Sequence, residues 1–320
     1  MTKALRWGIV GTGKIARTFA SDLAYITEGT VHAVGSRSLE SAERFAREFE
    51  VPDAHGSYEE LVSNPNVDAV YVATPHPMHR SNALLALNAG KHVLVEKAFT
   101  MNAGEAREVV GLAREKNLFL MEAMWTRFLP HVVKIRQLVA SGALGKIVAF
   151  EADHGKWFPE DPTSRLFAPE LGGSALLDLG VYPISFASML LGKPTSMKCV
   201  VEPAFTGVDG YCSMLFTYEQ GVQSILTCTS SARTATRACI SGTEARIEID
   251  GDFYAPGGFS LISKKGEVER FEFPTQGRGL HHQAIEVAQR IWNGEIESPW
   301  MPLDETVEIM ATMDEVLSNL

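Results

Sequence analysis

Short apolar runs alternate with amphipathic stretches over the first 123 residues of the chain. Such runs are typical of strands buried on both faces of a sheet, and an apolar residue every third or fourth position is typical of a helix. The candidate strands are Leu5–Val10, Thr30–Ser36, Ala69–Ala73, His92–Val95 and Leu118–Glu122, and two clear candidate helices are Ser38–Glu50 and Asn102–Lys116. Strands that alternate with helices predict a parallel sheet covered by helices on both faces.

The pattern changes beyond Trp125, where strand candidates become longer and follow one another directly. They include Cys212–Tyr218, Gln223–Thr229 and Ala245–Ile249, and residues 131–141, 174–191, 281–293 and 304–318 have helical periodicity. This half is predicted to be an α+β domain with a large, mostly antiparallel open sheet. The predicted organisation is therefore an α/β domain over 1–123 and a substrate-binding and oligomerisation domain over 124–320.

The charge of the chain narrows the choice of partner. Lys and Arg number 29 against 39 Asp and Glu, which gives a formal net charge of −10. This balance argues against nucleic acid and against an anionic membrane as partners, and favours a small molecule.

The cysteines of the chain indicate its compartment. No CxxC spacing occurs among them, so we expect buried free thiols in a reducing compartment at Cys199, Cys212, Cys228 and Cys239. With no secretion signal and no apolar run of membrane-spanning length, we expect the protein in the cytoplasm.

A glycine-rich turn follows the first candidate strand and opens a helix. In Gly11-Thr12-Gly13-Lys14-Ile15-Ala16, Gly11 permits the tight turn, Gly13 lets a pyrophosphate approach the backbone, and Ala16 allows close helix packing. The amides at the start of the following helix suit the phosphates of a dinucleotide. The loop therefore predicts an N-terminal Rossmann doubly wound sheet in which Gly11, Thr12, Gly13, Lys14 and Ile15 contact a nicotinamide dinucleotide.

The second strand indicates which dinucleotide. It ends in Gly35-Ser36-Arg37-Ser38, without the acidic residue that usually holds the adenosine ribose in NAD enzymes. Ser36 and Arg37 suit a 2′-phosphate, which predicts NADP in preference to NAD. NAD remains the alternative, in which Arg37 is a solvent-exposed residue at a strand end.

Three further motifs make the chain resemble a known family over nearly its full length. They are Ala73-Thr74-Pro75-His76-Pro77-Met78-His79, Gly90-Lys91-His92-Val93-Leu94-Val95-Glu96-Lys97, and Gly172-Gly173-Ser174-Ala175-Leu176-Leu177-Asp178-Leu179-Gly180-Val181-Tyr182. With the phosphate loop, they are similar to the glucose-fructose oxidoreductase, inositol dehydrogenase and rhizopine-catabolism (GFO/IDH/MocA) family. The resemblance is strongest to its dimeric dihydrodiol dehydrogenase and xylose dehydrogenase branch.

The resemblance implies a catalytic set of Lys97, Asp178 and Tyr182. The lysine matches a catalytic residue and the aspartate a substrate-orienting residue, while the tyrosine stands where histidine is common. Oxidation of an alcohol needs a base for the hydroxyl proton and charge stabilisation on the same oxygen. Our hypothesis is that Tyr182 relays the proton, Lys97 holds the substrate oxygen and lowers the tyrosine pKa, and Asp178 orients the substrate and Lys97. The roles of Lys97 and Tyr182 could be exchanged.

Residues near the same strand ends are expected to contact the cofactor or the substrate. On the cofactor side these are Thr74, Pro75, His76, His79, Glu96, Lys97 and Trp125, with a packed, helix-capping role as the alternative for His79. Ala98 replaces the family proline. Because a cis bond before a residue other than proline costs roughly 2.5–4 kcal/mol, we expect a trans Lys97–Ala98 bond.

The substrate is expected to be a sugar, polyol or cyclic diol. Its candidate contacts are Lys97, Trp125, Trp157, Phe158, Arg165, Asp178, Tyr182 and His281, although Trp157 and Phe158 could simply pack and His281 could be solvated. No metal is expected. The predicted function is an NADP-dependent oxidoreductase acting on CH–OH groups, as a homodimer or homotetramer formed through the second-domain sheet. The alternatives are an NADPH-dependent keto-sugar reductase and a non-catalytic dinucleotide sensor.

Overall fold

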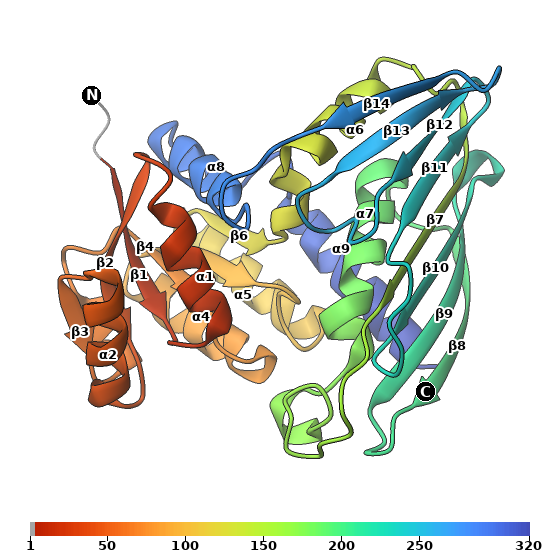
Figure 1. The fold of residues 1–320 in the computed structure, drawn as a ribbon. Coiled ribbons are helices and arrows are strands. Elements are labelled where there is room, and N and C mark those ends of the chain that lie inside the picture. Colours follow the sequence, from red (N-terminus) through yellow and green to blue (C-terminus); the bar gives the residue numbers. More distant parts are fainter. Residues whose placement is uncertain (1–3) are drawn as a thin grey trace. The chain divides into compact units, whose positions relative to one another are not determined.

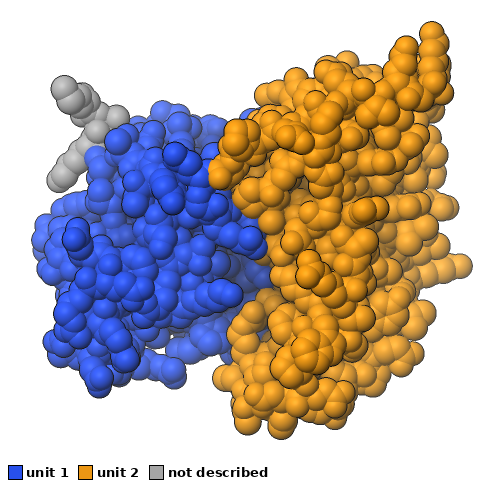
Figure 2. Space-filling view, viewed as in Figure 1, with its two compact units in different colours: residues 1–125, 276–310 blue, residues 126–275, 311–320 orange. Residues whose placement is uncertain are grey.

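The computed structural model describes residues 4–320, which form two compact units (Figure 2). Unit 1 comprises Met1–Trp125 and Gln276–Met310, and unit 2 comprises Thr126–Thr275 and Ala311–Leu320. The sequence-based division assigned every residue after 123 to the second domain. In the structure the chain returns to unit 1 at Gln276, so that division misses one segment of unit 1.

Unit 1 is built on a parallel sheet whose strand order is β3-β2-β1-β4-β5-β6. The strands are β1 (Leu5–Val10), β2 (Gly29–Gly35), β3 (Asp53–His55), β4 (Ala69–Val72), β5 (His92–Glu96) and β6 (Leu120–Ala123). This is the doubly wound order of a dinucleotide-binding sheet, and its order reverses between β1 and β4. The predicted Rossmann domain is confirmed, and β3 is the one strand of this sheet that the apolar pattern did not indicate.

Two of the helices of unit 1 begin at polar caps that the sequence indicates. The helices of this unit are α1 (Lys14–Leu23), α2 (Leu39–Phe49), α3 (Tyr58–Ser63), α4 (His79–Asn88), α5 (Ala103–Glu115) and α8 (His281–Trp292), with the 3₁₀ turn η1 (His76–Met78) before α4. The side chains of Ser38 and Asn102 accept hydrogen bonds from the backbone N–H three residues later and so begin α2 and α5. Both helices were predicted to within a residue at each end.

The returning segment is tied to the rest of unit 1 by long-range hydrogen bonds at two places. The buried carboxylate of Asp22, in α1, accepts hydrogen bonds from the amides of Arg278 and Leu280 at 2.7–3.1 Å. The amide of Leu120, at the start of β6, donates to the carbonyl of Ile296 at 3.0 Å. A hydrogen bond across more than 170 residues leaves no local pattern in the sequence, which explains why the segment was assigned to the other domain.

Unit 2 is built on an eight-stranded sheet with the order β14-β13-β12-β11-β7-β10-β9-β8 (Figure 1). The strands are β7 (Ile147–Gly155), β8 (Ser196–Pro203), β9 (Asp209–Thr217), β10 (Gln223–Thr229), β11 (Ala238–Gly242), β12 (Ala245–Ile249), β13 (Gly258–Ser263) and β14 (Val268–Glu272). Only β7 and β10 pair in parallel. The predicted large, mostly antiparallel sheet is confirmed.

Helices cover one face of this sheet. They are α6 (Pro130–Ala140), the π-helical turn η4 (Leu176–Gly180) and α7 (Val181–Leu191), and unit 2 also contains the short 3₁₀ turns η3 (Pro169–Leu171) and η5 (Glu219–Gly221). The helix α9 (Leu303–Leu317) and the 3₁₀ turn η2 (Trp125–Phe128) each begin in unit 1 and end in unit 2. α7 packs against β7 and β10, and buried side chains such as Phe150, Leu226 and Phe186 fill the space between. The core of unit 2 therefore lies directly beneath the segment that carries Asp178 and Tyr182.

The helical run Pro169–Leu191 is long and apolar enough to cross a membrane, contrary to the sequence-based expectation. Its mean hydropathy is 1.5, but 78% of the apolar window is buried inside the protein. A core helix passes the same test of length and composition, so this run is weak support for a membrane span.

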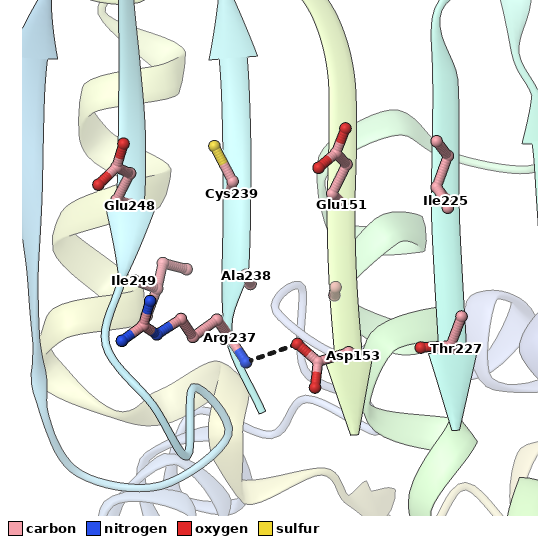
Figure 3. Close-up of a pocket in the computed structure, with 10 residues that line it drawn as sticks. Glu151, Asp153, Ile225, Thr227, Arg237, Ala238, Cys239, Glu248 and Ile249 are labelled. Atoms are coloured by element: carbon pink, nitrogen blue, oxygen red, sulfur yellow. Dashed lines mark hydrogen bonds between the residues drawn. The ribbon is translucent and has the colours of Figure 1, made fainter. Parts of the chain in front are cut away.

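The four cysteines are free thiols, but only Cys212 and Cys228 are buried. Cys199 and Cys239 are half-buried, so the expectation of burial was wrong for these two. Cys239 lies on the sheet face away from the helices, between Glu151 and Glu248 of the adjacent strands (Figure 3). Burial raises the pKa of its thiol.

Candidate functional site

The phosphate loop of unit 1 lies where the strand order reverses. Gly11 follows β1 with φ +107°, and its amide donates to the carbonyl of Gly35 at 2.9 Å. A Cβ on Gly11 would lie 2.9 Å from the carbonyl oxygen of Ala73, which follows β4. Both the backbone angle and the close approach require glycine. The loop is therefore packed into the crevice in which open α/β sheets bind ligands.

Gly13 leaves open space in front of the first turn of α1. A Cβ placed on Gly13 would meet no atom within 4 Å, and among the described residues no side chain caps the helix there. The backbone amides at the start of this ten-residue helix consequently face outward, as an anionic phosphate requires. A groove of about 620 Å³ runs from Thr12, Gly13 and Lys14 along α1 to Arg278. These residues fit a bound pyrophosphate.

Ser36 and Arg37 lie at the end of β2, on the same edge of the sheet. The Ser36 hydroxyl accepts a hydrogen bond from the amide of Ser38, and Arg37 is exposed. Within residues 4–320 no carboxylate forms an ion pair with Arg37. Burial raises the pKa of the nearby Tyr58, and the positive charge of Arg37 opposes that rise. An accessible guanidinium without an acidic partner suits a phosphate group.

The residues that follow β4 mostly form hydrogen bonds with neighbouring groups of unit 1. The Asn82 side chain donates to the Thr74 hydroxyl at 3.1 Å, and Pro75 is exposed ahead of η1. His79 has no exposed surface, and its two ring nitrogens lie 2.7 and 2.9 Å from the carbonyls of Thr74 and Ala98. Burial lowers the pKa of His79. This position agrees with the packed-histidine alternative rather than with a direct cofactor contact.

The end of β5 brings Glu96 and Lys97 to the same sheet edge. Glu96 is buried and accepts a hydrogen bond from the hydroxyl of Tyr71. The Lys97–Ala98 peptide bond is cis, so our expectation of a trans bond was wrong. That expectation considered the bond in isolation. In the structure, His76 and His79 contact the carbonyls of Lys97 and Ala98, and the Phe99 amide donates to Glu122 at 3.1 Å.

The returning segment adds a residue that the sequence reasoning missed. The guanidinium of Arg278 lies 5.6 Å from the ring centroid of the buried Trp125, and Arg278 also lines the groove beside the phosphate loop. Only its basic character in a glycine-rich stretch, Gly277-Arg278-Gly279, could have indicated this. Arg278 is therefore a second cation available to a ligand held by the phosphate loop.

His281 does not join these residues at the carboxyl ends of the strands. It is buried at the start of α8, with Nδ1 3.9 Å from Asp22 Oδ2 and its ring 6.0 Å from that of Tyr25. Asp22 lies in the last turn of α1 and Tyr25 just beyond it, at the end of the helix opposite the phosphate loop. His281 is therefore packed rather than solvated, and its contact with a substrate stays a prediction.

In unit 2, the structure brings Arg165 and Asp178 together. Nη2 of Arg165 lies 3.1 Å from both carboxylate oxygens of Asp178, which is in η4. The helix turn that carries Asp178 begins where the buried Asp209 accepts a 2.6 Å hydrogen bond from the amide of Leu176. Arg165 was expected to touch a substrate, and here it also holds the orienting carboxylate.

Tyr182 lies in a cluster of aromatic rings at the start of α7. Its ring is 5.3 Å from that of His154 and 4.8 Å from that of Tyr254, and His154 stacks on Tyr254 at 4.4 Å. The ammonium of Lys156 lies 4.7 Å above the ring of Tyr254. The sequence reasoning missed His154 and Tyr254, since a single histidine in a strand is ordinarily a core residue. This cluster packs the ring of Tyr182 against His154 and Tyr254, and the cation lies over Tyr254.

Trp157 and Phe158, the aromatic pair that follows β7, differ in their exposure. Trp157 is 65% exposed, and the amide of the half-buried Phe158 donates to the carbonyl of Ser230 at 3.1 Å. An exposed indole on the unit that carries Asp178 and Tyr182 is available to a ligand. Across residues 4–320 no cluster of three His, Cys, Asp or Glu side chains could hold a metal ion.

Comparison with known proteins adds the family context. The profile described as "Oxidoreductase family, NAD-binding Rossmann fold" matches residues 5–124, and "GFO/IDH/MocA C-terminal domain" matches residues 132–248. Trans-1,2-dihydrobenzene-1,2-diol dehydrogenase from Sus scrofa is 39% identical over 98% of this chain and 96% of the relative. The Homo sapiens protein of the same name is 37% identical over 98% and 96%.

A solved structure shares both the fold and part of the sequence. The 3-ketoreductase KijD10 from Actinomadura kijaniata, crystallised with NADP and TDP-benzene, has a TM-score of 0.86 and 28% sequence identity. The similarity covers 99% of this chain and 98% of that chain. The similarity in sequence and in fold thus extends through both units.

Proposed function

Because the chain belongs to the GFO/IDH/MocA family of oxidoreductases, we propose that it uses NADP to interconvert a hydroxyl and a carbonyl group on a sugar, polyol or cyclic diol. The observation that carries the proposal is the uncapped start of α1 behind Gly13, at the point where the strand order reverses. When bound, the nicotinamide accepts or donates the hydride. The residues of the chain hold the dinucleotide, orient the substrate and move the proton.

The preference for NADP rests on Arg37. An exposed guanidinium flanked by Ser36 and Ser38 offers charge-assisted hydrogen bonds to a 2′-phosphate, and no acidic residue follows β2 to hold a ribose diol. The 28% identical ketoreductase was crystallised with NADP, which agrees with this choice.

Steady-state kinetics of Arg37→Ala test that preference. We expect kcat/KM for NADP to fall about 10- to 100-fold with little change for NAD, since charge-assisted hydrogen bonds contribute about 1.5–3 kcal/mol. Arg47→Ala is the matched control, because Arg47 is an exposed arginine of α2 paired with Glu43. Equal losses for both dinucleotides would remove Arg37 as the selecting residue.

The substrate class follows from the side chains of unit 2 together with the relatives. The curated relatives at 37–39% identity are named for a cyclic diol, and the solved relative is named as a 3-ketoreductase and was crystallised with TDP-benzene. The exposed Trp157 and the Arg165–Asp178 pair offer an apolar face and polar anchors for a hydroxylated ring. The reductase direction is the second candidate, which the ketoreductase relative favours.

We assign the proton step to Tyr182. In oxidation its phenolic oxygen accepts the substrate hydroxyl proton, and Lys97 holds the substrate oxygen on which negative charge develops. Asp178, fixed by Arg165, accepts a hydrogen bond from a neighbouring hydroxyl and orients the ring. A pH–rate profile of Tyr182→Phe tests this assignment. The loss of kcat with the loss of one ionisation supports it, while unchanged kcat would leave Lys97 as the base.

We further propose that the chain forms a homodimer through the face of the unit 2 sheet that its helices leave open. Figure 3 shows Glu151, Ile225, Cys239 and Glu248 on this face, with the helices behind the sheet. A hollow of about 480 Å³ lies among them, and Ile225, Val200 and Tyr211 are 42–60% exposed. Open apolar sheet faces favour association. Light scattering should give a dimer that Ile225→Glu dissociates, and a 35.0 kDa wild-type species would refute it.

A further inference from the structure

Pro183 removes a hydrogen-bond donor from the helix that carries Asp178 and Tyr182. In an α-helix, the carbonyl of each residue accepts from the N–H four residues later. For Leu179 that residue is Pro183, which has no N–H. Leu179 lies where the π-helical turn η4 passes into α7, between the two proposed functional residues. Its carbonyl therefore lacks its ordinary α-helical donor, and within this helix it shares with the carbonyl of Leu176 the N–H of Val181.

His154 supplies a donor to this carbonyl from the adjacent strand. Its Nδ1 lies 3.1 Å from the oxygen of Leu179, and because a carbonyl can only accept, Nδ1 carries the proton. His154 has no exposed surface. It lies in β7, which is paired with β10 on one side and β11 on the other, so its backbone is held at the centre of the sheet.

The same histidine supports the ring of Tyr182. The two rings meet edge to face, with centroids 5.3 Å apart and an interplanar angle of 61°. His154 also stacks on Tyr254, whose ring lies 4.8 Å from that of Tyr182, so the three rings are mutually in contact. The helix already lies close to the sheet here, because a Cβ on Gly180 would lie 2.8 Å from Sγ of Cys228. His154 thus contacts both the backbone before Tyr182 and the side chain of Tyr182.

From these contacts we propose that His154 is a positioning residue, which replaces the helix donor that Pro183 removes and thereby sets the orientation of Tyr182. The inference rests on the proposed function only where it predicts turnover. A ring of similar shape that lacks the N–H should pack in the place of His154. The junction between η4 and α7 should then open more often, because the carbonyl of Leu179 has lost the N–H of His154. The resulting error in the direction of the phenol lowers kcat more than it raises KM.

Restoring the lost donor provides a direct test. His154→Phe keeps a flat ring and removes the N–H. Pro183→Ala, in the same chain, returns a backbone N–H that can reach the carbonyl of Leu179. Hydrogen exchange measured by mass spectrometry on the peptide spanning residues 174–186 reports on the junction without any need for substrate. His154→Gln, whose amide can donate, serves as the conservative variant.

We expect His154→Phe to exchange faster in this peptide by about tenfold, the equivalent of one hydrogen bond, and to lose kcat about tenfold with KM within about twofold. Adding Pro183→Ala should restore the exchange rate and kcat to within about threefold of wild type. For His154→Gln, both quantities should lie between those of wild type and those of His154→Phe. Arg270→Ala, an exposed ion-pair residue of β14, should leave both unchanged.

Unchanged exchange in His154→Phe, or a double variant no better protected than the single one, would overturn the proposal. If His154→Phe does not fold, the comparison of His154→Gln with and without Pro183→Ala decides by the same criteria. A wild-type protein without turnover on any substrate would count against the proposed function, while the exchange data would still decide the role of His154.

Discussion

Both carboxylate oxygens of Asp178 lie 3.1 Å from Nη2 of Arg165. The Asp178 side chain is 10% exposed and that of Arg165 is 53% exposed, so the pair joins a nearly buried carboxylate to a cation in contact with solvent. A carboxylate in such a place needs a compensating charge or hydrogen bonds. Arg165 therefore fixes one rotamer of Asp178 at the turn that leads to Tyr182.

Removal of Arg165 should weaken catalysis more than stability. For Arg165→Ala we expect kcat/KM to fall about tenfold, because Asp178 loses a partner that contributes about 1 kcal/mol after solvent screening. The kcat/KM of Arg165→Lys should lie between those of wild type and Arg165→Ala, since an ammonium keeps the charge but lacks the planar fork of the guanidinium. Steady-state kinetics on one substrate measure this. The matched control is Arg270→Ala, another exposed arginine paired with an aspartate, and equal losses in both variants would contradict the account.

Two glycines of the phosphate loop should respond differently to alanine. A Cβ on Gly13 enters open space at φ −72°, so Gly13→Ala should change the free energy of unfolding by less than about 0.5 kcal/mol. The same methyl group occupies the proposed pyrophosphate position and should raise the Kd for NADP at least about tenfold. Calorimetric titration together with urea unfolding checks both quantities.

Gly11→Ala is the comparison, because Gly11 has φ +107° and a Cβ there lies 2.9 Å from the carbonyl of Ala73. We expect it to lower the free energy of unfolding by about 1–3 kcal/mol. If Gly13→Ala binds NADP as tightly as wild type, the pyrophosphate does not lie against Gly13.

His131 should make the folded protein less stable in acid. It is buried in α6, and burial lowers its pKa from 6.5 to about 4. Below its ordinary pKa the unfolded chain binds a proton at this position, whereas the folded chain binds one only near pH 4. The stabilisation is therefore complete above about pH 6.5 and is lost progressively toward pH 4, by on the order of 3 kcal/mol.

Urea unfolding of wild type and His131→Gln between about pH 7 and pH 4.5 measures this loss. The variant should show a shallower decline, by up to about 1.4 kcal/mol for each pH unit. Parallel curves for the two proteins would show that His131 titrates alike in the folded and unfolded chains.

Local patterns predicted most of the elements that position the site. β1, β10 and β12 begin and end at the predicted residues, because a run of apolar or alternating residues determines a strand directly. β3 was missed, since Asp53–His55 is short and half-exposed and shows neither pattern. The phosphate loop and Arg37 were also accessible to prediction, because each follows a recognisable strand.

Features that depend on distant contacts could not be predicted. The carboxylate of Asp22 holds Leu280 across 258 residues, and nothing near either residue indicates that contact. The cis Lys97–Ala98 bond lies among carbonyl contacts from His76 and His79, which become visible only when β4 and β5 are paired. The contact of His154 with Leu179 likewise requires the sheet and the helix together.

The central claim is hydride transfer to and from a hydroxylated carbon, and turnover itself tests it most directly. Absorbance of the reduced nicotinamide should be followed with NADP and a panel of sugars, polyols and cyclic diols, and with NADPH and the matching carbonyl compounds. We predict turnover on at least one member of the panel, with kcat lowered at least about 100-fold in Lys97→Met and Tyr182→Phe and dinucleotide binding retained. Tight binding of NADP without turnover in either direction would contradict the account and identify a dinucleotide sensor.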